Sequence, residues 1–227
     1  MSNNPTPTPA PKRIRRDQDQ QLADDITAAR QTITTVQSDA ELSAFLAPRG
    51  YDNDKLAEGL VLQQAAQDAF NGRQQAMGTQ KQATAALTGA EAAARHAYGD
   101  FRDTARAIFK DSGTRNGLGL TGIVSKDTQK FITAARASYE VALNTPTYQS
   151  ELTKYGYPAT TIQSARALLD AFLAADNAQE QAIGAAQRAT QQRDEAAATL
   201  AAWISQFRAI AKVATRGRAD LVQKLGL

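Results

Sequence analysis

The chain has 227 residues, a length that suits one large domain or two small ones. It contains no cysteine, which excludes disulfides and cysteine-ligated zinc or iron–sulfur centres. No stretch approaches the roughly 18 apolar residues of a membrane-spanning helix, and no apolar core follows a basic start as in a signal peptide. We therefore expect a cytoplasmic protein, while export by a route without such a signal stays open.

The composition favours helices throughout. Alanine, glutamine, arginine and leucine are abundant and stabilise helices, whereas valine, isoleucine and aromatic residues are sparse. Four of the seven prolines lie within the first eleven residues, which leaves Pro48, Pro146 and Pro158 for the rest of the chain. The pattern predicts an all-α protein with long helices.

Residues 1–16 form a basic tail rich in proline and threonine. Its cations Lys12, Arg13, Arg15 and Arg16 contribute +4 to a net charge of +3, so the remainder of the chain carries −1. Such a segment has too few apolar residues to fold, and we expect it to be disordered.

A first helix follows the tail. Its apolar residues recur at alternating steps of four and three, which places them on one helical face: Leu22, Ile26, Ala29, Ile33, Val36 and Ala40. We expect this helix to end near Leu46, because Pro48 and Gly50 follow.

The next helix is predicted to be long, because residues 54–110 contain no proline. Asp52 or Asn53 can cap its start. Its ends are apolar, and its middle, residues 71–95, consists mainly of small and polar residues. We favour one continuous helix over a bend near Gly72–Gly78, although such a bend would be physically possible. The residues that follow, Ser112–Ser125, contain four glycines and are predicted to form a flexible loop.

The second half of the chain repeats this order. A helical face is formed by Phe131, Ile132, Ala135, Tyr139 and Ala142. Pro146 interrupts it, which predicts a kink or a new start near Thr145. A second long proline-free helix is expected over residues 161–215.

The two halves match at a constant offset of 106 residues. The sequence Ile-Thr-Ala-Ala-Arg at 26–30 recurs at 132–136, Gly50-Tyr51 recurs as Gly156-Tyr157, and 22 of the 80 positions in 26–105 are identical to those in 132–211. We infer an internal duplication with repeats at 17–120 and 121–227. Two copies of a short and a long helix predict an elongated bundle of four main helices with pseudo-twofold symmetry, both repeats in one bundle.

Few residues could perform chemistry. The single histidine, His96, has no glutamate three residues before it and no nucleophile motif around it, so it is interpreted as a polar surface residue. We expect no catalytic residue, no metal and no cofactor, and hence no enzyme.

Two basic clusters are the candidate contact residues for a partner or an anion. They are Lys12, Arg13, Arg15 and Arg16 in the tail, and Arg208, Lys212, Arg216 and Arg218 near the end of the second long helix. The second cluster also complements the dipole at a helix C-terminus, so it can be explained without a ligand.

Three functions remain compatible with the sequence. The leading hypothesis is a structural or interaction protein that assembles with itself or scaffolds another protein. A membrane-associating or toxin-like bundle is the first alternative, because Trp203, Ile204, Phe207 and Ile210 beside Arg208 and Lys212 form an amphipathic segment. Core packing explains the same residues, and we favour it. Association with nucleic acid through the basic termini is the second alternative.

Overall fold

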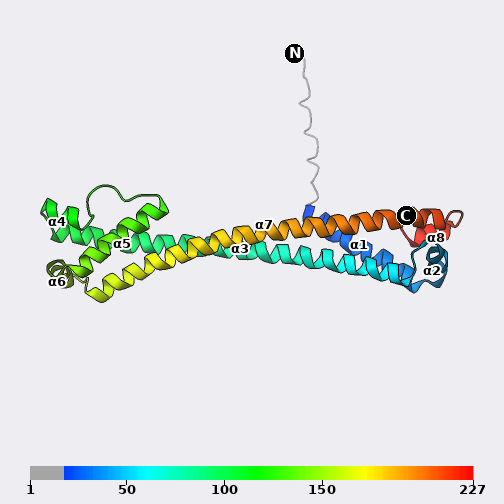
Figure 1. The fold of residues 1–227 in the computed structure, drawn as a ribbon, viewed down its shortest axis with the longest axis horizontal. Helices are drawn as coiled ribbons and strands as arrows, with labels where there is room; N and C mark the ends of the chain where they lie inside the picture. The colour runs from blue at the N-terminus through cyan, green and yellow to red at the C-terminus, as the bar shows by residue number, and fades with distance from the viewer. Residues whose placement is uncertain (1–17, 227) are drawn as a thin grey trace, which may run out of the picture. The chain divides into compact units, whose positions relative to one another are not determined.

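A computed structural model of the chain describes residues 18–226 (Figure 1). The predicted tail, with Lys12, Arg13, Arg15 and Arg16, lies outside the described residues. Between residues 18 and 226 every regular element is a helix and no strand occurs, which confirms the all-α prediction. In chain order the elements are α1 (Gln18–Ser38), α2 (Ala40–Leu46), the 3-10 turn η1 (Ala47–Arg49), α3 (Asn53–Ile108), α4 (Ser112–Gly117), α5 (Thr128–Asn144), α6 (Pro146–Lys154), α7 (Ala159–Ala214) and α8 (Ala219–Lys224).

The predicted first helix is divided in two at Asp39. The backbone of Asp39 is extended, and its carboxylate accepts hydrogen bonds from the amides of Glu41, at 3.0 Å, and Leu42, at 3.1 Å. An aspartate at this position satisfies amide groups that a new helix start leaves free. The helical region ends at Leu46 as predicted, but the expectation of one uninterrupted helix is wrong, because the sequence spacing does not reveal a side chain that competes with the helix backbone.

The corresponding break in the second half falls at Thr145, as predicted. Thr145 is extended, and Pro146 occupies the first turn of α6, where its missing amide costs nothing. Asp39 and Thr145 lie 106 residues apart, so both breaks occupy the same place in the two predicted repeats. Different side chains thus end one helix and begin the next at equivalent positions.

Both long helices are continuous, which confirms the prediction that α3 runs without interruption through Gly72–Gly78. Each has 56 residues, and α7 begins and ends 106 residues after α3. Asp52 caps α3 by accepting a hydrogen bond from the amide of Lys55 at 2.9 Å. Despite their length, neither these nor the other helices in residues 18–226 are apolar enough to cross a bilayer.

The chain folds as two compact units that divide both long helices. The first unit contains the described residues up to Gln74 together with those from Ala189 onward, and the second contains Gln75–Arg188. Each unit therefore takes the start of one long helix and the end of the other. The units cut across the predicted repeats 17–120 and 121–227, and the repeat boundary itself stays a prediction.

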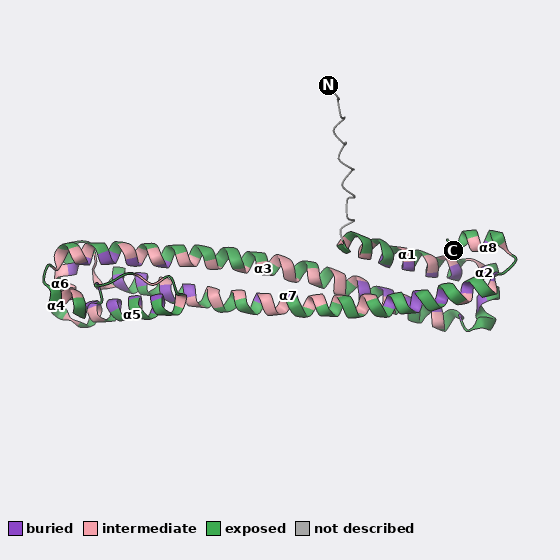
Figure 2. Ribbon diagram, turned by 90° about the horizontal axis from the view of Figure 1, so that it is seen from above, coloured by how far each residue is buried: buried purple, intermediate pink, exposed green. Residues whose placement is uncertain are grey.

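The core of the first unit is formed by α1, α2, α8, the start of α3 and the end of α7. Its aromatic centre is Tyr51, whose ring meets Trp203 and Phe207 edge-on, with centroid distances of 5.6 and 5.1 Å. The Trp203 ring also lies against the backbone of Gly59, where a methyl group would come within 2.5 Å of the ring. The buried residues of α1 recur along one face of that helix (Figure 2).

The core of the second unit is formed by α5, α6, the end of α3, the start of α7 and the segment after α4, which contributes Leu118 and Leu120. Tyr157 and Phe101 meet edge-on at 5.7 Å, and they lie at the positions that correspond to Tyr51 and Phe207. The position that corresponds to Trp203 is Ala97, and the one that corresponds to Gly59 is Ala165. The two cores thus share their aromatic contact but fill the neighbouring helix interface differently.

We expect Gly59→Ala to lower the stability of the first unit. Alanine gains about 1 kcal/mol of helix propensity over glycine, but the added methyl group clashes with Trp203, and overpacking costs typically 1–3 kcal/mol. Gly72→Ala is the matched control, because an added methyl group there meets no atom within 4 Å. Urea unfolding followed by the fluorescence of Trp203, the only tryptophan, should show a lower midpoint for Gly59→Ala and an unchanged or higher midpoint for Gly72→Ala. Equal midpoints for both variants would contradict the packing argument.

Candidate functional site

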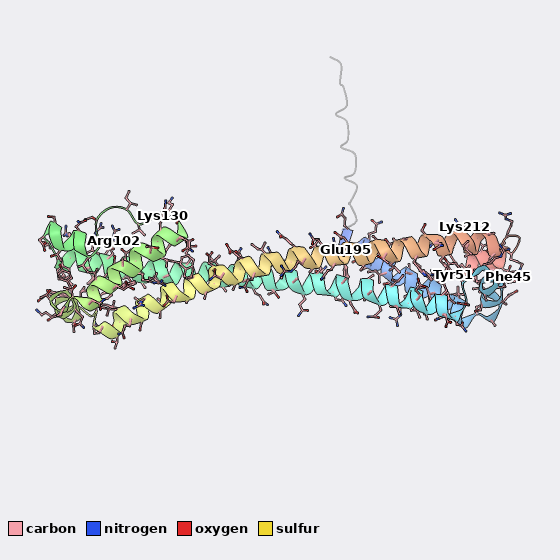
Figure 3. All side chains as sticks on the ribbon, viewed as in Figure 1. Phe45, Tyr51, Arg102, Lys130, Glu195 and Lys212 are labelled. Carbon is pink, nitrogen blue, oxygen red and sulfur yellow. The ribbon has the colours of Figure 1, made fainter. Side chains whose placement is uncertain are left out.

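A groove between α1 and α7 in the first unit, with a volume of about 510 Å³, is the candidate site. Its apolar part is formed by Leu22, Ile26, Ala29, Ala197, Leu200, Ala201, Ile204 and Ala209. Its polar part consists of Asp25 on α1 and Ser205, Arg208 and Lys212 on α7. Two of the predicted contact residues, Arg208 and Lys212, therefore line the same groove (Figure 3 labels Lys212).

The charged side chains of this groove are available to a ligand. Arg208, Lys212 and Asp25 are exposed, and none of them forms a hydrogen bond or an ion pair through its side chain with another residue in the range 18–226. Arg208 and Lys212 are one helical turn apart on α7, so their cations lie on one side of the groove. The groove thus combines an apolar floor with two cations that have no partner within the described chain.

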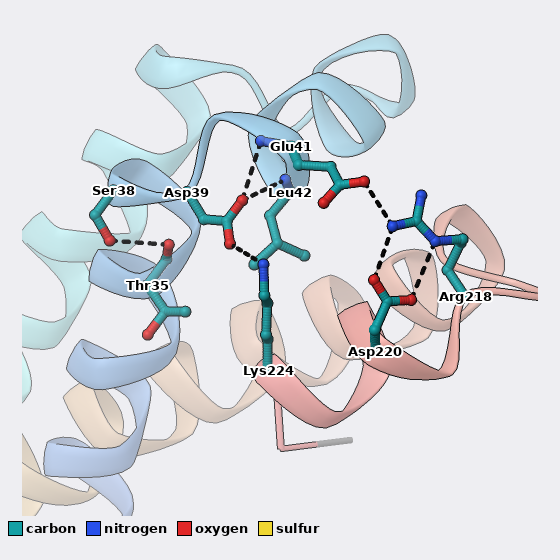
Figure 4. Close-up of polar contacts among 8 residues, drawn as sticks. All are labelled: Thr35, Ser38, Asp39, Glu41, Leu42, Arg218, Asp220 and Lys224. Carbon is teal, nitrogen blue, oxygen red and sulfur yellow. Dashed lines mark hydrogen bonds and ion pairs between the residues drawn. The ribbon is translucent and has the colours of Figure 1, made fainter.

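The other two predicted contact residues lie apart from the groove. Arg216 and Arg218 border a separate shallow hollow in the turn between α7 and α8. Arg218 is already paired, because its guanidinium contacts Glu41 at 2.6 Å and Asp220 at 2.7 Å (Figure 4). The hydrogen bonds that Arg218 donates to Asp220 and Glu41 raise its pKa. Its charge is therefore balanced within the unit.

A second ion pair joins α8 to the break between α1 and α2. The ammonium group of Lys224 lies 2.6 Å from a carboxylate oxygen of Asp39, whose other oxygen caps α2 (Figure 4). The hydrogen bond from Lys224, followed by that from the amide of Leu42, lowers the pKa of Asp39. The Asp39 carboxylate thus both caps the start of α2 and holds α8 through its ion pair with Lys224.

We expect Asp39→Asn to destabilise the first unit in a way that depends on pH. Asparagine keeps the helix cap but loses the charge that Lys224 contacts. Because the pKa of Asp39 is lowered in the folded state, its contribution is present above the ordinary value of 3.8 and is lost as the pH falls through the folded-state pKa. The stability difference between the wild type and Asp39→Asn should therefore be largest near neutral pH and disappear in acid.

Chemical denaturation at several pH values measures this difference. Lys224→Gln serves as the companion variant, since it removes the same ion pair from the other side and should add nothing to Asp39→Asn in the double variant. A difference that persists unchanged below the folded-state pKa would refute the role of the ion pair.

The second unit contains an arginine cluster that the sequence analysis did not identify. Arg95, Arg102 and Arg106 on α3 donate hydrogen bonds to backbone carbonyl groups of the segment that leads from α4 to α5 (Figure 3 labels Arg102). Arg102 contacts the carbonyl of Leu120 at 3.0 Å and that of Gly122, and Arg106 contacts Leu120 at 2.8 Å. Arg95 contacts the carbonyls of Ser125 at 2.8 Å and Lys126 at 3.0 Å.

These contacts correct the prediction of a flexible joint over Ser112–Ser125. Residues 112–117 form α4, whose start is capped by Asp111. Leu118 and Leu120 are buried on either side of Gly119, which has a φ of +67° that favours glycine. The segment after α4 is therefore held against α3 by apolar contacts and by three arginines. Its glycines allow backbone turns at positive φ.

Replacing Arg102 should release this segment. Its side chain is only 8% exposed and binds carbonyl groups of three successive residues, at 120–122. Hydrogen bonds that involve a charged group contribute about 1.5–3 kcal/mol, so Arg102→Gln should lower the stability of the second unit by about that amount and speed amide exchange in residues 118–126. Lys130→Gln is the control, because the exposed Lys130 side chain has no bonded partner within residues 18–226. Unchanged exchange in Arg102→Gln would contradict the assignment.

The remaining sequence predictions concern single residues. His96 is exposed and contacts Asp100 at 2.8 Å, which confirms its interpretation as a surface residue. Trp203, Ile204 and Phe207 are buried in the core of the first unit, as the packing interpretation predicts. Across residues 18–226 no three histidine, aspartate or glutamate side chains gather in a way that could hold a metal ion.

Comparison of the chain with protein-family models, with curated proteins and with solved structures finds no match.

Proposed function

We propose that this chain is a non-catalytic helical protein that acts through protein–protein contacts, either by assembling with itself or by scaffolding another protein. The observation that carries the proposal is the central part of each long helix. Residues 71–86 of α3 and 174–195 of α7 belong to neither core cluster of the described chain. Only Ala182 and Ala186 are buried in these segments, so both helices continue over a long stretch that contributes little to a core.

The surface of these segments supports helix packing from outside. Exposed alanines occur in both, among them Ala85, Ala86 and Ala178. Alanine allows helix backbones to approach closely and loses no side-chain entropy when it is buried. Each contact buries little area, so stable association needs a long run of them, and an uninterrupted helix supplies such a run.

We also infer that the chain arose by internal duplication. Three correspondences support this beyond the sequence identities: the equal bounds of α3 and α7, the breaks at Asp39 and Thr145, and the left-handed glycines Gly50 and Gly156, with φ of +85° and +86°. The pseudo-twofold arrangement of four main helices in one elongated bundle stays a prediction. A duplicated helical unit without chemistry of its own is typical of proteins that provide surfaces.

Light scattering behind a sizing column, over a range of concentration and salt, tests the proposal. We expect a mass above that of one chain, or a mass that rises with concentration. Ala86→Glu together with Ala178→Glu places charges on the two alanine surfaces and should reduce the mass. Gln82→Glu is the control, because it adds a negative charge to the same helix without covering an alanine. A wild-type protein that stays monomeric at every concentration and salt would refute self-assembly.

A further inference from the structure

The second unit shows what can lie in a groove of this kind. The three arginines that hold the segment after α4 are Arg95, Arg102 and Arg106. The residues 106 positions later are Ala201, Arg208 and Lys212, and all three line the groove of the first unit. The surface between α3 and α5 in the second unit is therefore the counterpart of the surface between α7 and α1 in the first. In the second unit the chain itself covers it.

The covering segment binds through its backbone and through a few aliphatic side chains. Its carbonyl groups accept the arginine hydrogen bonds, while Leu120 and Val124 pack against the core. Ile123 between them is almost fully exposed. The segment bends at Gly119 and Gly122, which have positive φ. This surface thus accepts a bent chain that places aliphatic side chains against the helices and leaves the residues between them exposed.

The groove of the first unit lacks such a cover among residues 18–226. Side-chain differences also make it more open: Asp25 stands where the second unit has Phe131, and Ala201 stands where it has Arg95. In the second unit Arg95 lies over the Phe131 ring, 4.3 Å from its centroid, and the two side chains fill the corresponding space. The first unit therefore keeps two cations and an apolar floor but loses the residues that would fill the groove from within.

The chain before α1 is a poor candidate for the missing cover. Helix α1 begins one turn earlier than α5 in the common register, and Asp19 attaches this turn to Arg73 at 2.6 Å and to Arg193 at 2.9 Å. Residues 1–17 contain no glycine, whereas the covering segment of the second unit uses Gly119 and Gly122 at positive φ. They also carry four cations, which Arg208 and Lys212 would repel.

The geometry points to a segment of a partner protein, carrying aliphatic side chains and at least one carboxylate, as the occupant of this groove. Its aliphatic side chains lie over Ile26, Leu200 and Ile204, and its carbonyl and carboxylate oxygens accept hydrogen bonds from Arg208 and Lys212. Charge complementarity selects the carboxylate, because the groove holds two cations without a partner within the described chain against the single carboxylate of Asp25, which leaves it positive. This inference rests on the proposed function, since it specifies one surface through which the protein contacts another.

The first test uses a peptide that the molecule itself suggests. The probes are a labelled peptide with the sequence of residues 118–127 and the same peptide with Thr121→Glu, and binding to the full chain is measured by fluorescence anisotropy. We expect the acidic peptide to bind more tightly. Arg208→Gln combined with Lys212→Gln should weaken its binding about tenfold, as expected for the loss of charged hydrogen bonds. Lys81→Gln combined with Lys130→Gln removes two exposed cations elsewhere and should leave binding unchanged.

A second pair of variants tests the apolar floor. Ala201→Leu fills the groove at an exposed position and should weaken binding about tenfold, whereas Ala202→Leu, on the adjacent exposed position outside the groove, should not. No binding of either peptide, or equal loss in both leucine variants, would overturn the proposal. Light scattering on the same variants separates this result from self-assembly: an unchanged mass with lost peptide binding leaves the assembly proposal standing, and a mass that falls in Arg208→Gln/Lys212→Gln would identify a second copy as the occupant instead.

The chain's own first residues are tested by cross-linking. Because the protein has no cysteine, Ile14→Cys and Ala201→Cys introduce the only two thiols. Rapid disulfide formation within single chains would show that residues 1–17 occupy the groove and would overturn the partner proposal. Failure to cross-link under conditions in which the acidic peptide binds would support it.

Discussion

The edge-on contact between Tyr51 and Phe207 brings the start of α3 against the end of α7, and the contact between Tyr157 and Phe101 does the same for the start of α7 and the end of α3. Each core depends on this antiparallel pairing. A short helix and the long helix that follows it in the chain supply only part of the buried apolar residues, and the end of the other long helix supplies the rest. Neither predicted repeat can therefore complete a core from its own residues, and both long helices must pass from one compact unit into the other.

The two units use a common backbone plan with different side chains. Where the first unit places the large Trp203 against Gly59, the second has the small residues Ala97 and Ala165 at the corresponding positions, so the two interfaces are filled by different side chains. Close packing fixes each interface separately, since neither a cavity nor an overlap is tolerated without loss of stability. Asp25 and Ala201 likewise stand at the positions of Phe131 and Arg95, and the groove is open in the first unit where the second is filled.

Charged residues also play different roles in the two units. Arginines in the second unit bind backbone carbonyls and attach a connecting segment, whereas in the first unit Arg218 and Lys224 pair with carboxylates and attach α8. Arg208 and Lys212 take part in neither arrangement within residues 18–226. Their position beside an apolar floor is what distinguishes the groove from an ordinary charged helix face.

Much of the fold was determined by local sequence and could be predicted from it. Alanine-rich, proline-free runs specify α3 and α7, Pro146 specifies the break before α6, and the offset of 106 residues relates the two halves. The break at Asp39 was not predicted, because the apolar residues continue at helical spacing across it. The break comes from the Asp39 carboxylate, which binds the amides of Glu41 and Leu42. Arg208, Lys212 and Arg218 could all be predicted as candidate contacts from their charge. The sequence could not show that Arg218 is neutralised, because one of its partners, Glu41, lies 177 residues before it in the chain. Tertiary structure alone decided which ends of the helices meet, which cations are neutralised and which groove stays open, because each of these depends on contacts between residues that are distant in the sequence.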